Sequence, residues 1–495
     1  MRRIEIIPGA SALLQSLRGL GYSPETAIAD LIDNSIAAGA AAVTVDLDWN
    51  EGDSIARVLD DGRGMDDAGL VKAMCFGGEG PTGVRAQDDL GRFGLGLKTA
   101  SLSQCRRLTV ASRQNCEIAA LAWDVDAVIE SGRWDALIPD RLTPSPQLDL
   151  LLRHESGTLV QWDRMDAIGG LSGLERDAFY LRVRDIGAHL GMAFHRFLAG
   201  DARRVSITLN GRAVKAWDPF QRHHPATITM PSEPVRHGGR TFTVTPYVLP
   251  HRDRFANDAE WEASGGPGGW GERQGFYVYR GKRLLVPGGW LGLGGTRAWT
   301  RDEASRLARI AVDLPTELDA DWRIDVRKSQ ARPPGRLRPR LTAIAGLCRE
   351  KAREVFAWRG SRAKPQRRQG ELEDIWISAG SAAARYRIRR NHPVVEVIAE
   401  ALGTHRTLLE GLLAFLERTV PVERIWLDVA ESEGAPAPVL ADAEIPALAT
   451  QLASLVSTMA PTDSVEVRVD QLIRHLPGDT AALKRAVLAQ LGHQP

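Results

Sequence analysis

The first 170 residues alternate between helical and strand-like patterns of hydrophobic positions. Ser23-Pro24 predicts a helix start, because a serine hydroxyl can cap the first turn and proline needs no N–H there. Apolar positions at helical spacing then continue to Ala38, and Gly39 provides a stop. Alternation of apolar and polar residues predicts a strand over 42–49, and further strands over 54–60, 107–112, 117–125 and 157–162. These elements predict helices packed on a mainly antiparallel sheet.

The pattern of hydrophobic positions changes near residue 170. It predicts a helix over 175–199, followed by strands over 205–209, 242–249, 276–279 and 308–314. Residues 360–370 are basic and polar and contain a proline, which is typical of a linker. Beyond it we expect amphipathic helices over 393–417 and 445–459 with one strand, 424–429, between them. The fold class is therefore α+β, with domains at 1–168 and 169–345, a basic helix and linker at 346–372, and a mainly helical C-terminal module at 373–495.

Composition places the chain among soluble globular proteins. Its 495 residues are 43% hydrophobic and 25% charged, and no stretch of about 18 uncharged apolar residues occurs. Glu5 and Pro8 interrupt the apolar run that a signal peptide would need, so we expect a cytoplasmic protein. The four cysteines lie far apart without a Cys-x-x-Cys pair, which indicates buried small hydrophobic side chains rather than a zinc site or a disulfide framework.

The net charge of +1 conceals one strongly basic segment. Residues 327–368 hold 14 Lys or Arg against two acids, Glu350 and Glu354, a net charge of +12. Such a segment can neutralise nucleic-acid phosphates without reading bases. A solvated helix and linker would also account for it.

Two acidic segments of the first domain can carry chemistry. Asp30 and Asn34 lie four residues apart on the first predicted helix and therefore share a face. A carboxylate and an amide oxygen so placed can serve a Mg²⁺ ion and its waters. In Asp60-Asp61-Gly62-Arg63-Gly64-Met65, a carboxylate at a strand end precedes two glycines that permit a tight turn and close approach to a flat ligand.

Two further segments complete the set. The first is Gly91-Arg92-Phe93-Gly94-Leu95-Gly96-Leu97-Lys98-Thr99. Its glycines expose backbone N–H groups and Lys98 adds a positive charge, which suits phosphate oxygens. It does not follow the Rossmann pattern, since no strand precedes it directly. In the second, Ser156-Gly157-Thr158, the Thr158 hydroxyl enters a strand and can bond to a buried polar partner.

In this order and spacing the four segments resemble the motifs of the GHKL ATPases: gyrase B, MutL, the ninety-kilodalton heat-shock chaperones and the MORC proteins. The resemblance implies a Bergerat fold that binds ATP between helices and sheet. It implies that Asn34 binds Mg²⁺, Asp60 accepts from the adenine amino group, Gly64 with Met65 lies against the base, and Thr158 supports Asp60 through water. Around the phosphates it places Gly91, Gly94, Gly96, Lys98 and Thr99. The loop from Phe76 to Leu90 would be the ATP lid.

One position departs from the family pattern. Hydrolysing members usually have glutamate, the general base, four residues before the Mg²⁺ asparagine, whereas this chain has Asp30. Aspartate has the same chemistry but is one methylene shorter, and a displacement of about 1 Å can cost about a hundredfold in rate. ATP hydrolysis is therefore expected with Asp30 as base, and ATP binding with little turnover stays open as the alternative.

The second domain resembles the transducer domain of MORC-type proteins. The resemblance lies in Phe276-Tyr277-Val278-Tyr279-Arg280-Gly281-Lys282-Arg283-Leu284-Leu285, followed by Gly288-Gly289-Trp290. In GHKL transducers a basic residue reaches the γ-phosphate. Lys328, preferred over Arg327, is the expected catalytic residue here, because a positive charge stabilises the transition state of phosphoryl transfer.

The resemblance further implies a nucleotide-dependent homodimer that acts as a clamp. With the basic segment 332–368, it predicts action on duplex DNA in defence or genome maintenance, alongside nuclease or helicase partner proteins and without a membrane role. A chaperone-like ATPase acting on protein clients is the alternative. The predicted cofactors are ATP and Mg²⁺.

Overall fold

The computed structural model forms two compact units, residues 1–358 and 359–495. The predicted domain limits stay predictions. The structure describes residues 9–19, 21–51, 53–76, 96–167, 170–201, 203–295, 297–319, 321–324, 331–357, 375–381, 384–420, 444–458, 464–473 and 480–492.

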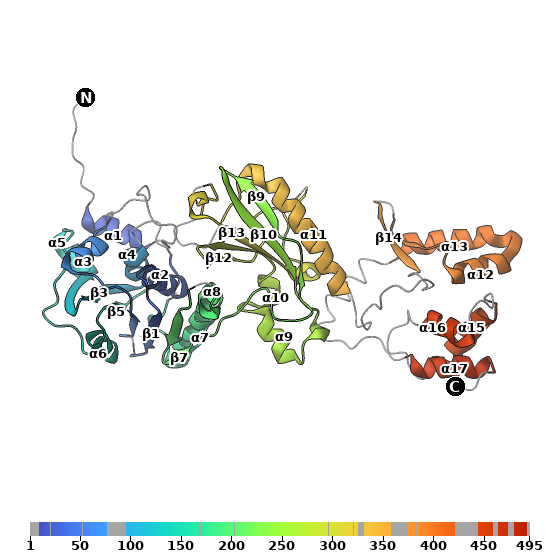
Figure 1. The fold of residues 1–495 in the computed structure, drawn as a ribbon, viewed down its shortest axis with the longest axis horizontal. Helices are drawn as coiled ribbons and strands as arrows, with labels where there is room; N and C mark the ends of the chain where they lie inside the picture. Colours follow the sequence, from blue (N-terminus) through green and yellow to red (C-terminus); the bar gives the residue numbers. More distant parts are fainter. Residues whose placement is uncertain are drawn as a thin grey trace, which may run out of the picture. The chain divides into compact units, whose positions relative to one another are not determined.

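The first unit contains two sheets (Figure 1). The first of them has strand order β4-β3-β5-β2-β1-β6-β7. Neighbouring strands are antiparallel except for β1 and β6, which are parallel. The predicted strands of the first domain are confirmed. The strands are β1 (Ala42–Asp48), β2 (Ile55–Asp60), β3 (Cys105–Gln114), β4 (Glu117–Asp124), β5 (Gly157–Met165), β6 (Ser206–Leu209) and β7 (Arg212–Ala213).

The sixth strand corrects one expectation. The pattern at 205–209 was assigned to the second domain, but β6 extends the first sheet alongside β1. An uncovered β1 would leave a row of backbone groups unpaired. Asn210 completes this edge, since its side chain accepts from Leu47 N at 2.8 Å and donates to Leu47 O at 3.0 Å.

Helices cover both faces of the first sheet. The predicted opening helix is confirmed as α2 (Pro24–Ala37), whose Ser23 side chain accepts from Thr26 N. It shares the main core with α1 (Ala10–Arg18), α3 (Asp67–Met74), α4 (Gly96–Leu102), α5 (Val125–Ser131) and α7 (Arg176–Ala193). A smaller core beneath α6 (Pro146–Arg153) buries Leu59 and Leu159 on the opposite face. Because β2 is buried on both sides, its final residue, Asp60, emerges in a largely dehydrated setting.

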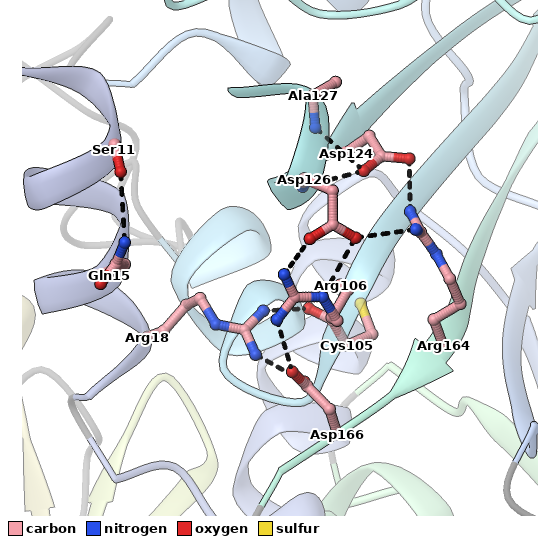
Figure 2. A network of polar contacts seen from close by, with 10 residues as sticks. All are labelled: Ser11, Gln15, Arg18, Cys105, Arg106, Asp124, Asp126, Ala127, Arg164 and Asp166. Atoms are coloured by element: carbon pink, nitrogen blue, oxygen red, sulfur yellow. Dashed lines mark hydrogen bonds and ion pairs between the residues drawn. The ribbon is translucent and has the colours of Figure 1, made fainter. Parts of the chain in front are cut away.

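An ion-pair network fastens α1 and α5 to the sheet (Figure 2). Arg18 of α1 contacts Asp166 at 2.5 Å and donates to Cys105 O at 2.7 Å. Arg106 joins Asp166 at 3.3 Å and also pairs with Asp126, which Arg164 contacts at 2.9 Å. Arg106, Asp126 and Arg164 are 34 to 48% exposed, so each pair that Asp126 makes contributes little, about 1 kcal/mol or less.

The second sheet has strand order β12-β11-β13-β10-β8, with β9 also paired to β10. Strands β11 and β13 are parallel and the other pairs antiparallel. Helix α11 (Arg338–Ala357) contributes Leu341, Ile344 and Cys348 to the core on one face. The strands are β8 (Ile228–Thr229), β9 (Glu233–His237), β10 (Arg240–Val248), β11 (Gly275–Arg280), β12 (Arg283–Pro287) and β13 (Ala308–Leu314), and the short helices α9 (Asp258–Gly265) and α10 (Gly269–Glu272) precede β11.

The predicted helix over 175–199 is divided in two. Helix α7 ends at Ala193 and α8 (His195–Ala199) begins after Phe194, whose φ of −109° and ψ of 14° leave the helical region. Phe194 is fully buried. The residues of α8 pack against the second sheet: His195 Nε2 lies 2.8 Å from Tyr279 Oη, and Arg196 pairs with Asp313. This junction therefore joins the two sheets of the first unit.

The second unit contains a hairpin and short helices. The hairpin of β14 (Trp376–Ser381) and β15 (Ala384–Ile388) was not predicted, and the predicted strand 424–429 lies outside the described residues. The expected helix 393–417 breaks at Gly403, giving α12 (Pro393–Leu402) and α13 (Arg406–Thr419). Helices α15 (Ile445–Thr458), α16 (Val465–Ile473) and α17 (Ala481–Gln490) share a separate core. Within the described residues, no helix is long and apolar enough to cross a membrane.

Two of the four cysteines depart from expectation. Cys105 and Cys348 are buried, as predicted. Cys75 and Cys116 are exposed, because Cys75 follows the end of α3 and Cys116 lies in the turn between β3 and β4.

Candidate nucleotide site

Asp60 ends β2 at the centre of the first sheet, and the residue is buried, with 7% of its surface exposed. Its Oδ2 accepts from Ser35 Oγ of α2 at 2.8 Å, and its Oδ1 accepts from Gly62 N at 2.9 Å. Burial raises the pKa of Asp60 above its usual value, while these two hydrogen bonds oppose that increase. The two bonds fix the carboxylate in one orientation, ready to accept a further donor.

The turn after Asp60 brings β2, β3 and β5 together at one place. Gly64 has a φ of +65°, and a Cβ there would overlap the carbonyl of Arg113. The next amide, Met65 N, donates to Ser112 Oγ at 2.9 Å, and Ser112 Oγ lies 2.9 Å from Thr158 Oγ1. Thr158 is also the register partner of Asp60 across β2 and β5. Only glycine fits this close backbone approach.

On α2, the structure places Asp30 beside the glycine-rich segment. Asp30 is 4% exposed, whereas Asn34 is exposed one turn later. A Cβ added to Gly96, the first residue of α4, would lie 3.7 Å from Asp30 Oδ2. Helices α2 and α4 are in contact (Figure 1). The structure therefore brings described residues of all four segments predicted from the sequence to one end of the sheet.

Residues 22–158 match the family model described as histidine kinase-, DNA gyrase B- and HSP90-like ATPase. This match supports the GHKL superfamily for the first domain, and the mixed α+β architecture with a largely antiparallel sheet fits such a domain. The family points to ATP binding and, in general, to ATP hydrolysis. A comparison with curated proteins finds no match to the chain.

In the first domain, Lys98 contacts backbone carbonyl groups. Its side chain is buried, and its Nζ donates to the carbonyls of Ala73 at 2.9 Å and Cys75 at 2.8 Å. Burial lowers the pKa of Lys98 to about 8. The ammonium thus binds carbonyls at the end of α3, where cations are favoured. A phosphate contact of Lys98, and of the buried Thr99, stays a prediction.

Several predicted positions lie outside the described residues. They are Gly91, Gly94, the lid apart from Phe76, and both Arg327 and Lys328. Phe76 itself packs against Trp123 and Trp134, with ring centroids 5.3 and 5.1 Å away. This aromatic cluster anchors the segment that leads from α3 toward the predicted lid.

The donor set fits Mg²⁺ bound together with a nucleotide. Among the described residues, no group of three or more His, Cys, Asp or Glu side chains is arranged to hold a metal ion. Mg²⁺ commonly takes only one or two protein oxygens and completes its shell with phosphates and waters. The exposed Asn34 amide and the neighbouring Asp30 carboxylate supply donors of that kind.

Three polar residues around the site were not predicted from the sequence. Ser35 holds Asp60 directly, Ser112 joins the turn to Thr158, and Asp33 pairs with Arg283 of β12. A hydroxyl at a buried helical position was a usable signal for Ser35. Nothing in the local sequence indicated the other two, because their partners lie 46 and 250 residues away.

Two arginines of the basic segment pair with acidic residues of the same fold, so fewer are available for nucleic-acid phosphates than the net charge implied. Arg349 of α11 is buried, contacts Asp302 at 2.6 Å, and lies 4.5 and 4.7 Å from the ring centroids of Trp290 and Trp299. Arg340 pairs with Glu233. The acids come from outside the segment, so a local charge count could not include them. Arg332, Arg336 and Arg338 are exposed, and residues 358–374 lie outside the described residues.

Proposed function

We propose that the first domain binds Mg²⁺-ATP through the residues named above. Asp60 accepts from the adenine amino group, Gly64 lies against the base, and Asn34 binds the ion, with the phosphates next to Gly96. The arrangement of Asp60 carries this proposal, because a buried carboxylate held by Ser35 and Gly62 is a preorganised acceptor for a flat donor.

Hydrolysis is assigned to Asp30 and Lys328. Asp30 orients or deprotonates the attacking water, and its closeness to Gly96 supports this role. Lys328 arrives from the second domain and stabilises charge on the transferring phosphoryl group. If the shorter aspartate side chain does not reach the attacking water, the domain binds ATP with little turnover and acts as an ATP-bound switch.

The experiment compares Asp30→Ala with the parent by phosphate release and by binding of a non-hydrolysable ATP analogue with Mg²⁺. Hydrolysis should fall at least about a hundredfold while analogue affinity changes little. Glu25→Gln is the matched control on the same helix, where Glu25 pairs with Arg182 at 3.3 Å. Turnover by Asp30→Ala at the parental rate would remove Asp30 from the mechanism, and undiminished hydrolysis in Lys328→Ala would remove Lys328.

At the level of the whole chain we propose a MORC-like, nucleotide-dependent homodimer that clamps duplex DNA in defence or genome maintenance. Exposed Arg332 and Arg336, which precede α11, and Arg338 at its first residue support phosphate contacts. Duplex affinity should fall steeply with salt, by roughly tenfold or more between 50 and 200 mM. Binding without salt dependence contradicts DNA clamping, and sedimentation with and without the ATP analogue tests dimerisation. Nuclease, helicase or methyltransferase genes nearby would support defence.

A chaperone-like function is the second candidate, and one surface favours it. Helix α13 exposes Leu408, Leu412 and Phe415, by 69, 54 and 64%, at helical spacing. Exposed apolar patches commonly bind proteins. Suppression of client aggregation without nucleic acid, lost in Leu412→Glu, would favour this candidate. Equal suppression by Leu412→Glu counts against it.

A further inference from the structure

A buried ion pair joins the second sheet to helix α2. Arg283 Nε lies 3.0 Å from Asp33 Oδ1, and the two side chains are 6 and 1% exposed. Arg283 opens β12, whereas Asp33 lies on α2 between Asp30 and Asn34. Separating a buried ion pair leaves an unpaired buried charge, which strongly destabilises the folded protein. This contact therefore holds β12 and α2 together.

The second sheet fixes the orientation of the Arg283 guanidinium. Gly281 and Lys282 have φ values of 52° and 69° and form a two-residue turn that pairs β12 with β11. The guanidinium carbon lies 4.4 Å from the centroid of the Phe194 ring, and Nη1 donates to Leu284 O. The arginine is therefore held by its own hairpin and by the Phe194 ring as well as by Asp33.

The position of Asp33 determines what this contact can do. It lies three residues after Asp30 and one before Asn34, within a single helical turn. A helix transmits a displacement at one residue to its neighbours because their backbone hydrogen bonds interlock. Movement of β12 would thus move the carboxylate and the amide assigned to catalysis and Mg²⁺.

We propose that Arg283 is a positioning residue, which uses Asp33 to hold Asp30 and Asn34 in the geometry for hydrolysis and so couples the second domain to the nucleotide site. This inference rests on the proposed function. Arg283 acts through α2 and contacts no reacting atom. Its loss should therefore lower kcat far more than it weakens nucleotide binding.

The test uses the full-length protein with two arginines of the same hairpin. Arg283→Met removes the contact with α2, whereas Arg280→Met removes a similarly buried pair, Arg280–Asp319 at 2.7 Å, within the second domain. We expect kcat to fall at least about tenfold in Arg283→Met, with affinity for a non-hydrolysable ATP analogue within about threefold of the parent. Arg283→Lys should restore part of kcat, and Arg280→Met should keep the parental kcat.

A second measurement needs no nucleotide. Amide hydrogen exchange should become faster over α2 in Arg283→Met and in Asp33→Asn, but not in Arg280→Met. Asp33→Asn removes the charge of the partner while keeping the size of the side chain. The same two measurements on this variant test the proposal if Arg283→Met folds poorly. Parental exchange over α2, or parental kcat in a folded Arg283→Met, overturns the proposal. A parent that neither binds nor hydrolyses ATP refutes the proposed function and with it the catalytic role, while the exchange result still decides whether Arg283 holds α2.

Discussion

Replacing Asp60 by asparagine separates nucleotide recognition from folding. Asp60→Asn keeps the size of the side chain and leaves an oxygen that can accept from Gly62 N. The introduced amide nitrogen would face Ser35 Oγ and could donate to it. The Ser35 hydroxyl would then donate to Leu31 O, which lies 3.3 Å away. Burial disfavours the charged carboxylate, so a neutral side chain should change the free energy of unfolding by only about 1 kcal/mol.

ATP binding should suffer much more. The substitution removes the charged acceptor proposed for the adenine amino group, and a hydrogen bond to a charged group contributes about 1.5–3 kcal/mol. At about 1.4 kcal/mol per factor of ten, the Kd for Mg²⁺-ATP should rise roughly 10- to 100-fold. Isothermal titration calorimetry would measure Kd, and urea unfolding would measure stability.

Asp61→Asn is the matched control for this experiment. Asp61 Oδ1 accepts from the amides of Ala41 and Ala42 at 2.7 and 2.9 Å, so the neighbouring carboxylate organises backbone only. Its replacement should leave ATP affinity unchanged. If Asp60→Asn is stably folded and binds ATP within threefold of the parent, the Asp60 carboxylate is not the acceptor for the adenine amino group.

Three further predictions concern stability. Burial lowers the pKa of His195 to about 4, so the folded protein keeps this side chain neutral, whereas the unfolded chain protonates it below about pH 6.5. The contribution of His195 to the free energy of unfolding is therefore fully present above pH 6.5. It decreases as the pH falls toward 4, by about 3 kcal/mol. Urea unfolding should show that His195→Gln flattens this pH dependence, and an unchanged slope would contradict the assignment. Gly64→Ala should destabilise by about 1–2 kcal/mol or more, since φ is +65° and the new Cβ meets the Arg113 carbonyl; an unchanged Tm would disprove this. Asp126→Asn should cost about 1 kcal/mol or less, and the loss should shrink in 1 M NaCl, because Arg106 and Arg164 are partly exposed; a salt-independent loss would argue against an electrostatic cause.

Much of the fold followed from local patterns. The strands of the first domain and the capped helix beginning at Pro24 were predictable, because alternation and capping are local signals. The strand at 206–209 was given to the wrong sheet, since strand partners depend on which edge remains open. The break at Phe194 was also missed, because the backbone leaves the helix where a ring packs under Arg283.

The sequence by itself was enough to predict that Asp30, Asn34, Asp60 and the glycine-rich segment form one nucleotide-binding pattern, because motif order and spacing are properties of the chain. Only the tertiary structure decided which groups hold those residues. Ser35 orients Asp60, carbonyls of Ala73 and Cys75 receive Lys98, and Arg283 pairs with Asp33. Ion pairs and hydrogen bonds act over a few ångströms of space whatever the separation along the chain, so partners 250 residues apart leave no local signal.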